Sequence, residues 1–398
     1  MSGTVLLYRD DPYLLDFEAQ VVERLTHEGQ PALVLDRTAF YAESGGQPWD
    51  TGTLGDVRVL RVIEHGGRIL HVVDRQPAAE TLRGLVDAQR RRDHMQQHHG
   101  QHLLSRAFVD TAGAPTVSFH LGADESSIDL DRLVADAQIR AAEDRANRVV
   151  AESRPVSVRT VPRGDAAALG VRVPDGAGDA VRIVDAEGFD RQACSGTHPA
   201  RTSEVGVVLV LGHERYKGGT RVRFVCGDRA RQAMHARIGV LDRMAQAMSA
   251  PWTELPDQAA RAIEEKAALA KRNEELRERA LAGEAYLLLA QHPESPAIVR
   301  AVFEGRDGAE VRGLAEQIVK VRPAVALLAS RGAKVQLVFA RSTGLAPDMN
   351  ALLKSVLTPH GGRGGGRPEM AQGGCDSIPD LEALLERLAS ELGQSRLE

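Results

Sequence analysis

Two short segments carry histidine and cysteine side chains at a spacing suited to binding a metal ion. His98 and His102 lie four residues apart in HHGQH. Cys194 and His198 lie four residues apart in CSGTH. Three imidazoles and one thiolate are borderline-soft ligands, the set that tetrahedral zinc prefers. Because the pairs are far apart in the sequence, the fold must bring two elements together around one ion. We therefore predict a Zn2+ site that forms only in the folded domain.

Neighbouring histidines leave open which pair would bind the ion. His94 and His98 are also four residues apart, and His99 follows His98 directly. Residues at this spacing lie on one face of a helix, although Gly100 makes the helix less regular. In CSGTH, Gly196 would allow a tight turn. Taken singly, each pair also fits a site without metal: an exposed polar helix face, or a buried cysteine followed by a structural histidine.

Three further segments are candidates for binding a ligand. In ESGGQ, glycines would let backbone N–H groups approach a ligand closely, and Gln47 offers a donor and an acceptor. In GGRGGGRP, backbone amides could hold phosphate while Arg363 and Arg367 neutralise its charge. RYKGGTRVR is a local basic patch that includes Arg215 and Lys217. The alternatives are a plain β-turn, a surface loop and a solvated hairpin, respectively.

Composition restricts the class of protein. The chain has 398 residues, of which 43% are hydrophobic and only 4% aromatic, so its cores must be mainly aliphatic. With a net charge of -5, any contact with nucleic acid needs a local basic patch. Three cysteines are too few for a disulfide framework and indicate a reducing compartment. We find no signal peptide and no apolar run long enough to span a membrane, and we expect a cytoplasmic protein.

Residue patterns predict an α+β fold with four parts. Short β-branched segments separated by turns predict a small N-terminal β-barrel or meander over residues 1–85. Helical segments flanked by strands predict an α/β core that contains the metal site over residues 86–228. Residues 229–292 have the pattern of a helical arm with charged faces. Residues 293–398 alternate strands and helices, contain the glycine-rich loop GGRGGGRPEMAQGG and close with a helix, as in a small α/β domain.

Four motifs, in their order, resemble those of one protein family. FYAESGGQPWDTG, HHGQHLLS, CSGTHPARTSEVG and ERYKGGTRVRFVCGDRA are similar to the editing domain of alanyl-tRNA synthetase and to its free-standing AlaX relatives. HHGQH matches the family's HxxxH, and CSGTH matches its CGGTH with Ser195 in place of glycine. GGRGGGRPEMAQGG resembles the end of the synthetase's C-terminal domain, which is related to the terminal domain of DHH-type phosphoesterases. The resemblance covers nearly the whole chain and points to the long form of AlaX.

This resemblance implies a zinc-dependent hydrolase that edits in trans. Its substrate would be tRNA(Ala) mischarged with serine or glycine, and it would lack aminoacylation activity, since the first predicted strand begins at Thr4 with no aminoacylation domain ahead of it. Gln47 and the ESGGQ backbone would shape the pocket, Glu43 and Ser44 would read the serine hydroxyl, and His99 would support a ligand or handle a proton. Four basic residues would contact the tRNA: Arg215, Lys217, Arg363 and Arg367. The C-terminal region would also form a homodimer and bind tRNA.

Four protein ligands raise a question about the zinc, because they close a tetrahedral site whereas a catalytic zinc keeps one position open. One ligand could be loosely held, the coordination could expand, or the zinc could mainly position substrate. Two other functions stay open. One is a non-catalytic tRNA-binding protein with a structural zinc. The other is a DHH-related phosphoesterase, which the lack of an Asp-His-His cluster in the C-terminal region disfavours.

Overall fold

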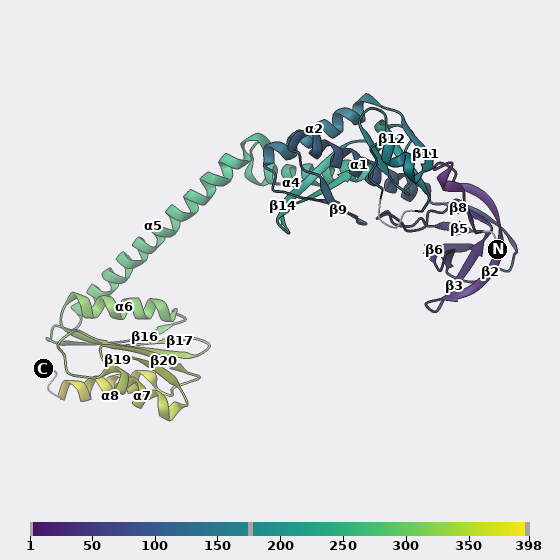
Figure 1. Ribbon diagram of the computed structural model, residues 1–398. Helices are drawn as coiled ribbons and strands as arrows, with labels where there is room; N and C mark the ends of the chain where they lie inside the picture. Colours follow the sequence, from purple (N-terminus) through teal and green to yellow (C-terminus); the bar gives the residue numbers. More distant parts are fainter. Residues whose placement is uncertain (1–2, 174–177, 395–398) are drawn as a thin grey trace. The chain divides into compact units, whose positions relative to one another are not determined.

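The computed structural model describes residues 3–173 and 178–394. The chain divides into two compact units, residues 1–244 and 245–398, and each contains helices packed on β-sheet (Figure 1). The predicted α+β class is confirmed. None of the described helices combines the length and the apolar composition needed to cross a bilayer.

The N-terminal part of the first unit consists of short antiparallel strands. Six of them pair in the closed order β2-β3-β7-β6-β5-β8. Their bounds are β2 (Asp16–His27), β3 (Gln30–Leu35), β5 (Gly52–Leu54), β6 (Val57–His65), β7 (Arg68–Val73) and β8 (Thr81–Val86). Alternate side chains point inward, as the burial along β8 shows, and they form an aliphatic core with Phe17 and Phe40. Outside this ring, β1 (Val5–Leu6) pairs with β4 (Arg37–Thr38), and η1 (Leu7–Arg9) lies between them in sequence.

Helix α1 (Ala88–Ala112) is the central element of the first unit. Asp87 caps its first turn by accepting bonds from the N–H groups of Gln89 and Arg90, and Gly113 ends it in a left-handed conformation with φ 58°. The arginine-rich stretch before HHGQH therefore belongs to the helix. Every residue from His94 to Ser105 is buried, although many of them are polar. Buried polar groups need partners, so this helix must be matched by polar groups on the elements around it.

Two sheets and a second long helix surround α1. Four strands form the antiparallel order β14-β15-β10-β9: β9 (Thr116–Leu121), β10 (Ser126–Leu130), β14 (Val208–Tyr216) and β15 (Gly219–Cys226). Three strands form the order β11-β12-β13: β11 (Val156–Pro162), β12 (Ala180–Ala186) and β13 (Asp190–Ala193). The remaining elements are α2 (Asp136–Glu152), α3 (Arg163–Ala168), η2 (Thr202–Val205) and α4 (Gly227–Met248). One apolar core joins α1, α2 and the four-stranded sheet.

The second unit is a five-stranded sheet with helices on both faces. The strand order is β16-β17-β18-β20-β19, and only β16 and β17 run parallel. The strands are β16 (Ala297–Glu304), β17 (Ala324–Arg331), β18 (Val335–Arg341), β19 (Arg363–Arg367) and β20 (Met370–Cys375). The helices are η3 (Trp252–Glu254), α5 (Leu255–Ala290), α6 (Gly308–Val321), α7 (Met349–Leu357), η4 (Thr358–His360) and α8 (Leu381–Gln394). One core packs α7 and α8 on the sheet, and the other packs α6 with the end of α5.

The predicted loop GGRGGGRPEMAQGG is wrong, because these residues form the hairpin of β19 and β20. The glycines serve packing between the hairpin and α7. A Cβ atom on Gly364 would lie 2.8 Å from the side chain of Leu357, and one on Gly373 would lie 2.5 Å from it. Only glycine lets the helix approach this closely. Arg363 and Arg367 lie exposed on the edge strand β19.

Candidate metal centre

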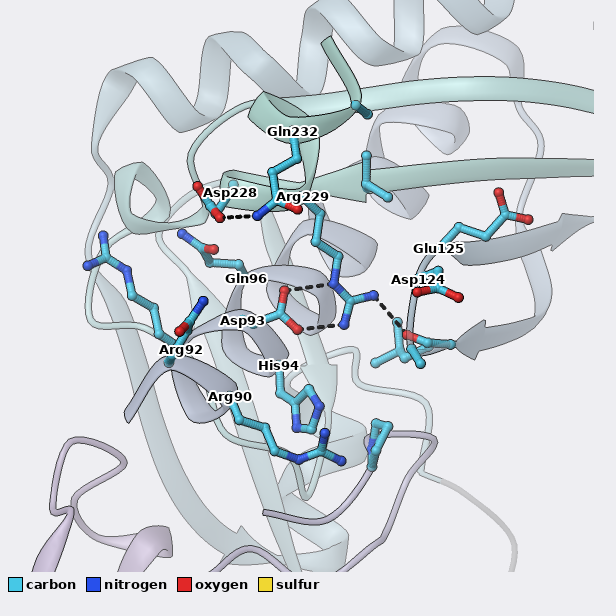
Figure 2. Close-up of a pocket in the computed structure, with 18 of the residues that line it drawn as sticks. Arg90, Arg92, Asp93, His94, Gln96, Asp124, Glu125, Asp228, Arg229 and Gln232 are labelled. Carbon is cyan, nitrogen blue, oxygen red and sulfur yellow. Dashed lines mark hydrogen bonds and ion pairs between the residues drawn. The ribbon is translucent and has the colours of Figure 1, made fainter. Parts of the chain in front are cut away.

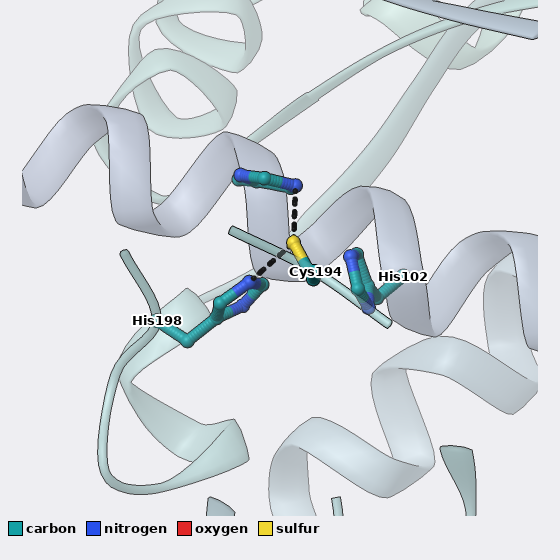
Figure 3. A group of neighbouring side chains, drawn as sticks. His102, Cys194 and His198 are labelled. Carbon is teal, nitrogen blue, oxygen red and sulfur yellow. Dashed lines mark hydrogen bonds between the residues drawn. The ribbon is translucent and has the colours of Figure 1, made fainter. Parts of the chain in front are cut away.

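The four predicted ligands converge in the first unit. His98 and His102 come from α1, whereas Cys194 and His198 come from the segment after β13 (Figure 3). One ligand atom from each residue lies within 4.8 Å of the other three. The Cys194 Sγ atom is 3.3 Å from His98 Nε2 and 3.2 Å from His198 Nε2. Ligand atoms of a tetrahedral zinc site lie roughly 3.5 Å apart, so the spacing fits one shared ion.

Gln47 orients the imidazole of His98. The side chain of Gln47 is fully buried, and its Oε1 atom accepts a hydrogen bond from His98 Nδ1 at 2.9 Å. The same oxygen accepts from the backbone N–H of Thr197 at 3.0 Å, while Gln47 Nε2 donates to Thr197 Oγ1 at 2.8 Å. These bonds hold Nδ1 of His98 away from the cluster and leave Nε2 facing it. Gln47 thereby ties α1 to the CSGTH segment.

Asp190 orients the imidazole of His102 in the same way. The carboxylate is buried, and its Oδ2 atom accepts from His102 Nδ1 at 3.3 Å. Burial by itself disfavours the charged imidazole, but Asp190 and Cys194 together raise the pKa of His102 to about 10. Burial also disfavours the thiolate of Cys194, yet the neighbouring imidazoles of His98 and His198 lower the pKa of that thiol well below its usual value. The site therefore favours a thiolate, the form that binds metal.

The imidazole of His198 also has a buried hydrogen-bond partner, which is His99. Their Nδ1 atoms are 3.1 Å apart, so one of them must donate the proton of a hydrogen bond. Burial lowers the pKa of His198 to about 3 and, with help from the surrounding imidazoles, lowers the pKa of His99 far below its usual value. Both rings are thus neutral. The Nε2 atom of His99 is buried and has no hydrogen-bond partner among the described residues.

The structure settles which histidines form the pair. His94 is buried on α1 but stands outside the group of four ligand atoms. Its Nδ1 atom has no partner among the described residues, and burial lowers its pKa to about 3. The pair in the cluster is therefore His98 with His102, and His99 lies behind His198.

The glycine of CSGTH serves close packing instead of the predicted tight turn. Gly196 does not have a positive φ. A Cβ atom at this position would lie 2.2 Å from Cε1 of His98 and 2.8 Å from Oε1 of Gln47. No larger residue fits between these two side chains, so glycine at this position allows the ligand segment to lie against α1.

ESGGQ forms a β-turn beside the cluster. The backbone groups of Ser44 and Gln47 bond to each other at 3.0 and 3.3 Å, and Gly45 and Gly46 have φ values of 53° and 79°. Positive φ at both central residues is typical of a type I′ turn. The Ser44 hydroxyl lies 3.2 Å from the hydroxyl of Ser195. The plain-turn alternative is thus correct for the backbone, but the turn borders the residue next to Cys194.

Three family models match parts of the chain. A DHHA1 domain matches residues 294–394, tRNA synthetases class II (A) match residues 13–89, and the threonyl and alanyl tRNA synthetase second additional domain matches residues 181–223. Alanine–tRNA ligase of Pyrococcus abyssi is 32% identical over 98% of this chain and 44% of its own length. This chain therefore spans less than half the length of such ligases.

A shorter relative is similar along its entire length. The alanyl-tRNA editing protein AlaX-L of Pyrococcus horikoshii is 29% identical over 97% of this chain and 98% of its own length. The chain is a homologue of AlaX-L. Among solved structures, the C-Ala domain from Aquifex aeolicus alanyl-tRNA synthetase is 29% identical over 24% of this chain and 90% of that domain, with a TM-score of 0.21.

The remaining predicted residues of this AlaX-L homologue lie apart from the ligands. Glu43 is exposed and pairs with Arg61 at 3.5 Å. Arg215 and Lys217 are exposed on the hairpin between β14 and β15 in the first unit. Arg363 and Arg367, in contrast, belong to the second unit. The predicted basic residues are therefore divided between the two units.

Sequence reasoning missed Asp190 and Arg182. Asp190 precedes Cys194 by four residues, and a carboxylate so close to a ligand motif was the available signal. Arg182 donates through Nη1 to the carbonyl oxygens of Cys194 at 2.9 Å and Gly196 at 2.8 Å, which holds the ligand segment in place. No spacing in the sequence indicated this second contact, because it comes from the neighbouring strand β12.

A groove of about 1810 Å3 opens on the other side of the turn (Figure 2). Gly46 is one of the residues that line it. His94 and neighbouring side chains of α1 line it as well. The groove carries charged side chains of both signs, among them Arg90, Arg92, Asp124 and Glu125. Arg229 is paired with Asp93, with Nε 2.7 Å from Oδ1, and it also donates to the carbonyl oxygen of Gly122 at 2.8 Å.

Proposed function

We propose that this protein is an aminoacyl-tRNA deacylase that edits in trans, hydrolysing the ester of tRNA(Ala) mischarged with serine and with glycine. An alanine pocket cannot exclude glycine, which is smaller, and it rejects serine only weakly. One methylene or hydroxyl provides about 1–3 kcal/mol of discrimination. A second site that hydrolyses the wrong ester restores accuracy. Similarity to AlaX-L along both chains supports the proposal, and the buried His98, His102, Cys194 and His198 cluster is the observation that carries it.

Zn2+ is the metal that the donor set fits best. One thiolate and three Nε2 atoms are directed at a common point, and the Nδ1 atoms of His98, His102 and His198 are each engaged elsewhere. Metal-binding histidines typically donate their second N–H to a carboxylate or carbonyl oxygen in this way. When bound, the ion would polarise an ester carbonyl or lower the pKa of water.

The residues around the ligands would orient the substrate. Cys194 and Ser195 are only partly buried, whereas the three histidines are almost completely covered. The aminoacyl end would therefore approach from the Cys194 side, past the glycine turn. There the hydroxyls of Ser44 and Ser195, 3.2 Å apart, would bind the hydroxyl of a seryl group.

The proposed reaction is a simple hydrolysis. A water oxygen attacks the ester carbonyl, the bond to the ribose oxygen breaks, and the ribose hydroxyl leaves with a proton. Gln47, Asp190 and His99 would act on the ligands and not on the ester. In particular, His198 would donate its Nδ1 proton to His99, which fixes the tautomer of both rings.

Deacylation of Ser-, Gly- and Ala-tRNA(Ala), measured side by side, tests the proposal. We expect release of serine and glycine and little release of alanine. Cys194→Ala should lower the rate about 100-fold or more, because losing a ligand should cost at least as much as losing a residue that supports a ligand, which costs about 10- to 100-fold. Cys375→Ala is the matched control, because this buried cysteine lies in the second unit. A purified protein that leaves Ser-tRNA(Ala) intact would contradict the proposal.

The same assay separates the other functions. Tight tRNA(Ala) binding that protects the mischarged ester would indicate a non-catalytic binding protein with a structural zinc. Cleavage of phosphodiesters without ester hydrolysis would indicate a phosphoesterase. Among the described residues of the second unit, no group of metal-ligating side chains comparable to the cluster occurs, which disfavours the phosphoesterase. We further propose that the exposed Arg363 and Arg367 contact tRNA and that the second unit forms a homodimer.

A further inference from the structure

Phe119 lies between the candidate metal centre and the groove. It belongs to β9, the edge strand of the four-stranded sheet, and 36% of its surface is exposed. Its ring centroid is 6.1 Å from that of His98, with the two rings tilted by 35°. The next residues of β9, His120 and Leu121, line the groove. The ring of Phe119 is therefore next to a candidate ligand, and the two residues that follow it in β9 line the groove.

The glycine turn is built against this ring. A Cβ atom on Gly46 would lie 2.6 Å from the ring of Phe119, so only glycine lets the turn approach the ring this closely. Gly45 faces the other way, where its Cβ would lie 2.9 Å from Oγ of Ser195. The two glycines of the turn thus face different neighbours: Gly45 lies beside Ser195, and Gly46 lies beside Phe119 and lines the groove.

The groove is lined by both arginines and carboxylates, so charge alone does not place a nucleic-acid end here. Arg229 is neutralised by Asp93, and the β9–β10 turn adds Asp124 and Glu125 to the groove. Stacking on an aromatic ring does not depend on a basic surface, and it accepts any base. The base and the ester of a terminal nucleotide are joined through a single ribose. A group that holds the base must therefore lie close to the group that holds the ester, as Phe119 lies close to His98.

We propose that Phe119 is a positioning residue that stacks against the unpaired base at the 3′ end of the RNA and so places the ester at the metal centre. The inference rests on the proposed function and adds to it a subsite for the terminal nucleotide. It also assigns a purpose to the close contact of Gly46 with the ring, which holds the ring in place beside His98.

Kinetics with two substrates test this role. For Phe119→Leu, we expect the KM for Ser-tRNA(Ala) to rise about tenfold or more, the effect of losing one stacked base, with a smaller change in kcat. Phe119→Trp, which keeps an aromatic ring at this position, should have a KM close to that of the wild type. Hydrolysis of a small seryl ester without a nucleotide should be unchanged. Equal losses on both substrates would show that the ring only supports His98, and unchanged kinetics on both would also overturn the proposal.

A binding measurement is independent of hydrolysis. An uncharged RNA hairpin with 2-aminopurine as its 3′-terminal base should lose fluorescence on binding the wild-type protein, because stacking quenches this base. The quenching should disappear in Phe119→Leu and persist in Val117→Ala, a control on the same strand with 67% of its surface exposed. Metal content should be equal in all three proteins. Absence of quenching in the wild type would overturn the inference. Quenching without deacylation would overturn the proposed hydrolase while retaining the subsite.

Discussion

At the scale of single residues, the candidate site is defined by the second nitrogen of each imidazole. An imidazole offers two nitrogens, and the one that faces a metal is set by what holds the other. His98 is held by Gln47 and His102 by Asp190, and both partners are buried. The Nε2 atoms of His98 and His198 lie 3.3 and 3.2 Å from the Cys194 sulfur. Such preorganisation reduces the ordering needed when the ion binds.

Asp190→Asn tests this arrangement. The change keeps the shape of the side chain but removes the negative charge that orients His102. We expect zinc affinity to fall about 10- to 100-fold, measured by competition with a chromophoric chelator. Asp185→Asn, on the neighbouring strand, should retain wild-type affinity, because Asp185 bonds the exposed Arg191 and no ligand. Equal affinities of Asp190→Asn and the wild type would show that His102 needs no such support.

At the scale of elements, polar groups inside apolar surroundings decide how helices and strands fit together. Helix α1 is buried around its whole circumference near the ligands, and its glutamines bond to the surrounding backbone. Gln97, for example, accepts from the N–H of Cys226 at 2.8 Å and donates to its carbonyl oxygen at 3.0 Å. Gly100 then lets β15 approach, since a Cβ there would lie 2.2 Å from Sγ of Cys226.

The barrel contains a buried histidine that should make its stability depend on pH. His71 is fully buried, its Nε2 atom lies 2.8 Å from Oγ1 of Thr38, and burial lowers its pKa from 6.5 to about 4. Because the folded-state pKa is depressed, the unfolded chain binds the proton first. The contribution of neutral His71 to stability is therefore fully present above about pH 6.5 and is lost as the pH falls toward 4. We expect a loss of about 2 kcal/mol between pH 7 and pH 5 from this residue.

Urea unfolding of the wild type and His71→Gln at both pH values measures this contribution. Glutamine cannot titrate, so the difference in unfolding free energy between the two proteins should shrink on acidification. Other buried histidines titrate equally in both proteins and cancel. A difference that stays constant between pH 7 and pH 5 would show that His71 does not titrate as its burial implies.

At the scale of the whole molecule, the ligands join only elements of the first unit. His98 and His102 belong to α1, whereas Cys194 and His198 follow β13, and all of them precede the boundary at residue 244. The second unit has two apolar cores of its own, formed around its sheet. Each unit thus contains the contacts that a cooperative folding unit needs.

Removal of the metal should therefore affect the two units differently. We expect a strong chelator to lower the unfolding temperature of residues 1–244 while leaving the transition of residues 245–398 in place, because metal affinity contributes to the stability of the state that binds it. Calorimetry would detect the unfolding transitions. Hydrogen exchange, measured on peptides from each unit, would assign each transition to a unit. Equal loss of amide protection in both units would mean that they unfold as one.

Several features of the protein could be predicted from residue types and spacing. Hydrophobic periodicity predicted the α+β class, because it reports which side of an element is buried. The types and spacing of the two ligand pairs predicted which four residues converge in the cluster, because imidazole and thiolate groups are common metal ligands. Periodicity reports burial but not partners, and GGRGGGRP was consequently interpreted as a loop, whereas pairing with β20 makes Arg363–Arg367 a strand.

Only the tertiary structure decided which groups act on the ligands. His94 and His98 have the same spacing as His98 and His102, and the choice between them depends on where the CSGTH segment lies against α1. Gln47, Asp190 and Phe119 reach the site from the loop before β5, from β13 and from β9, respectively. The residue types of the candidate metal centre could thus be predicted from the sequence. Their orientation could not, because it depends on contacts between segments that are distant in sequence.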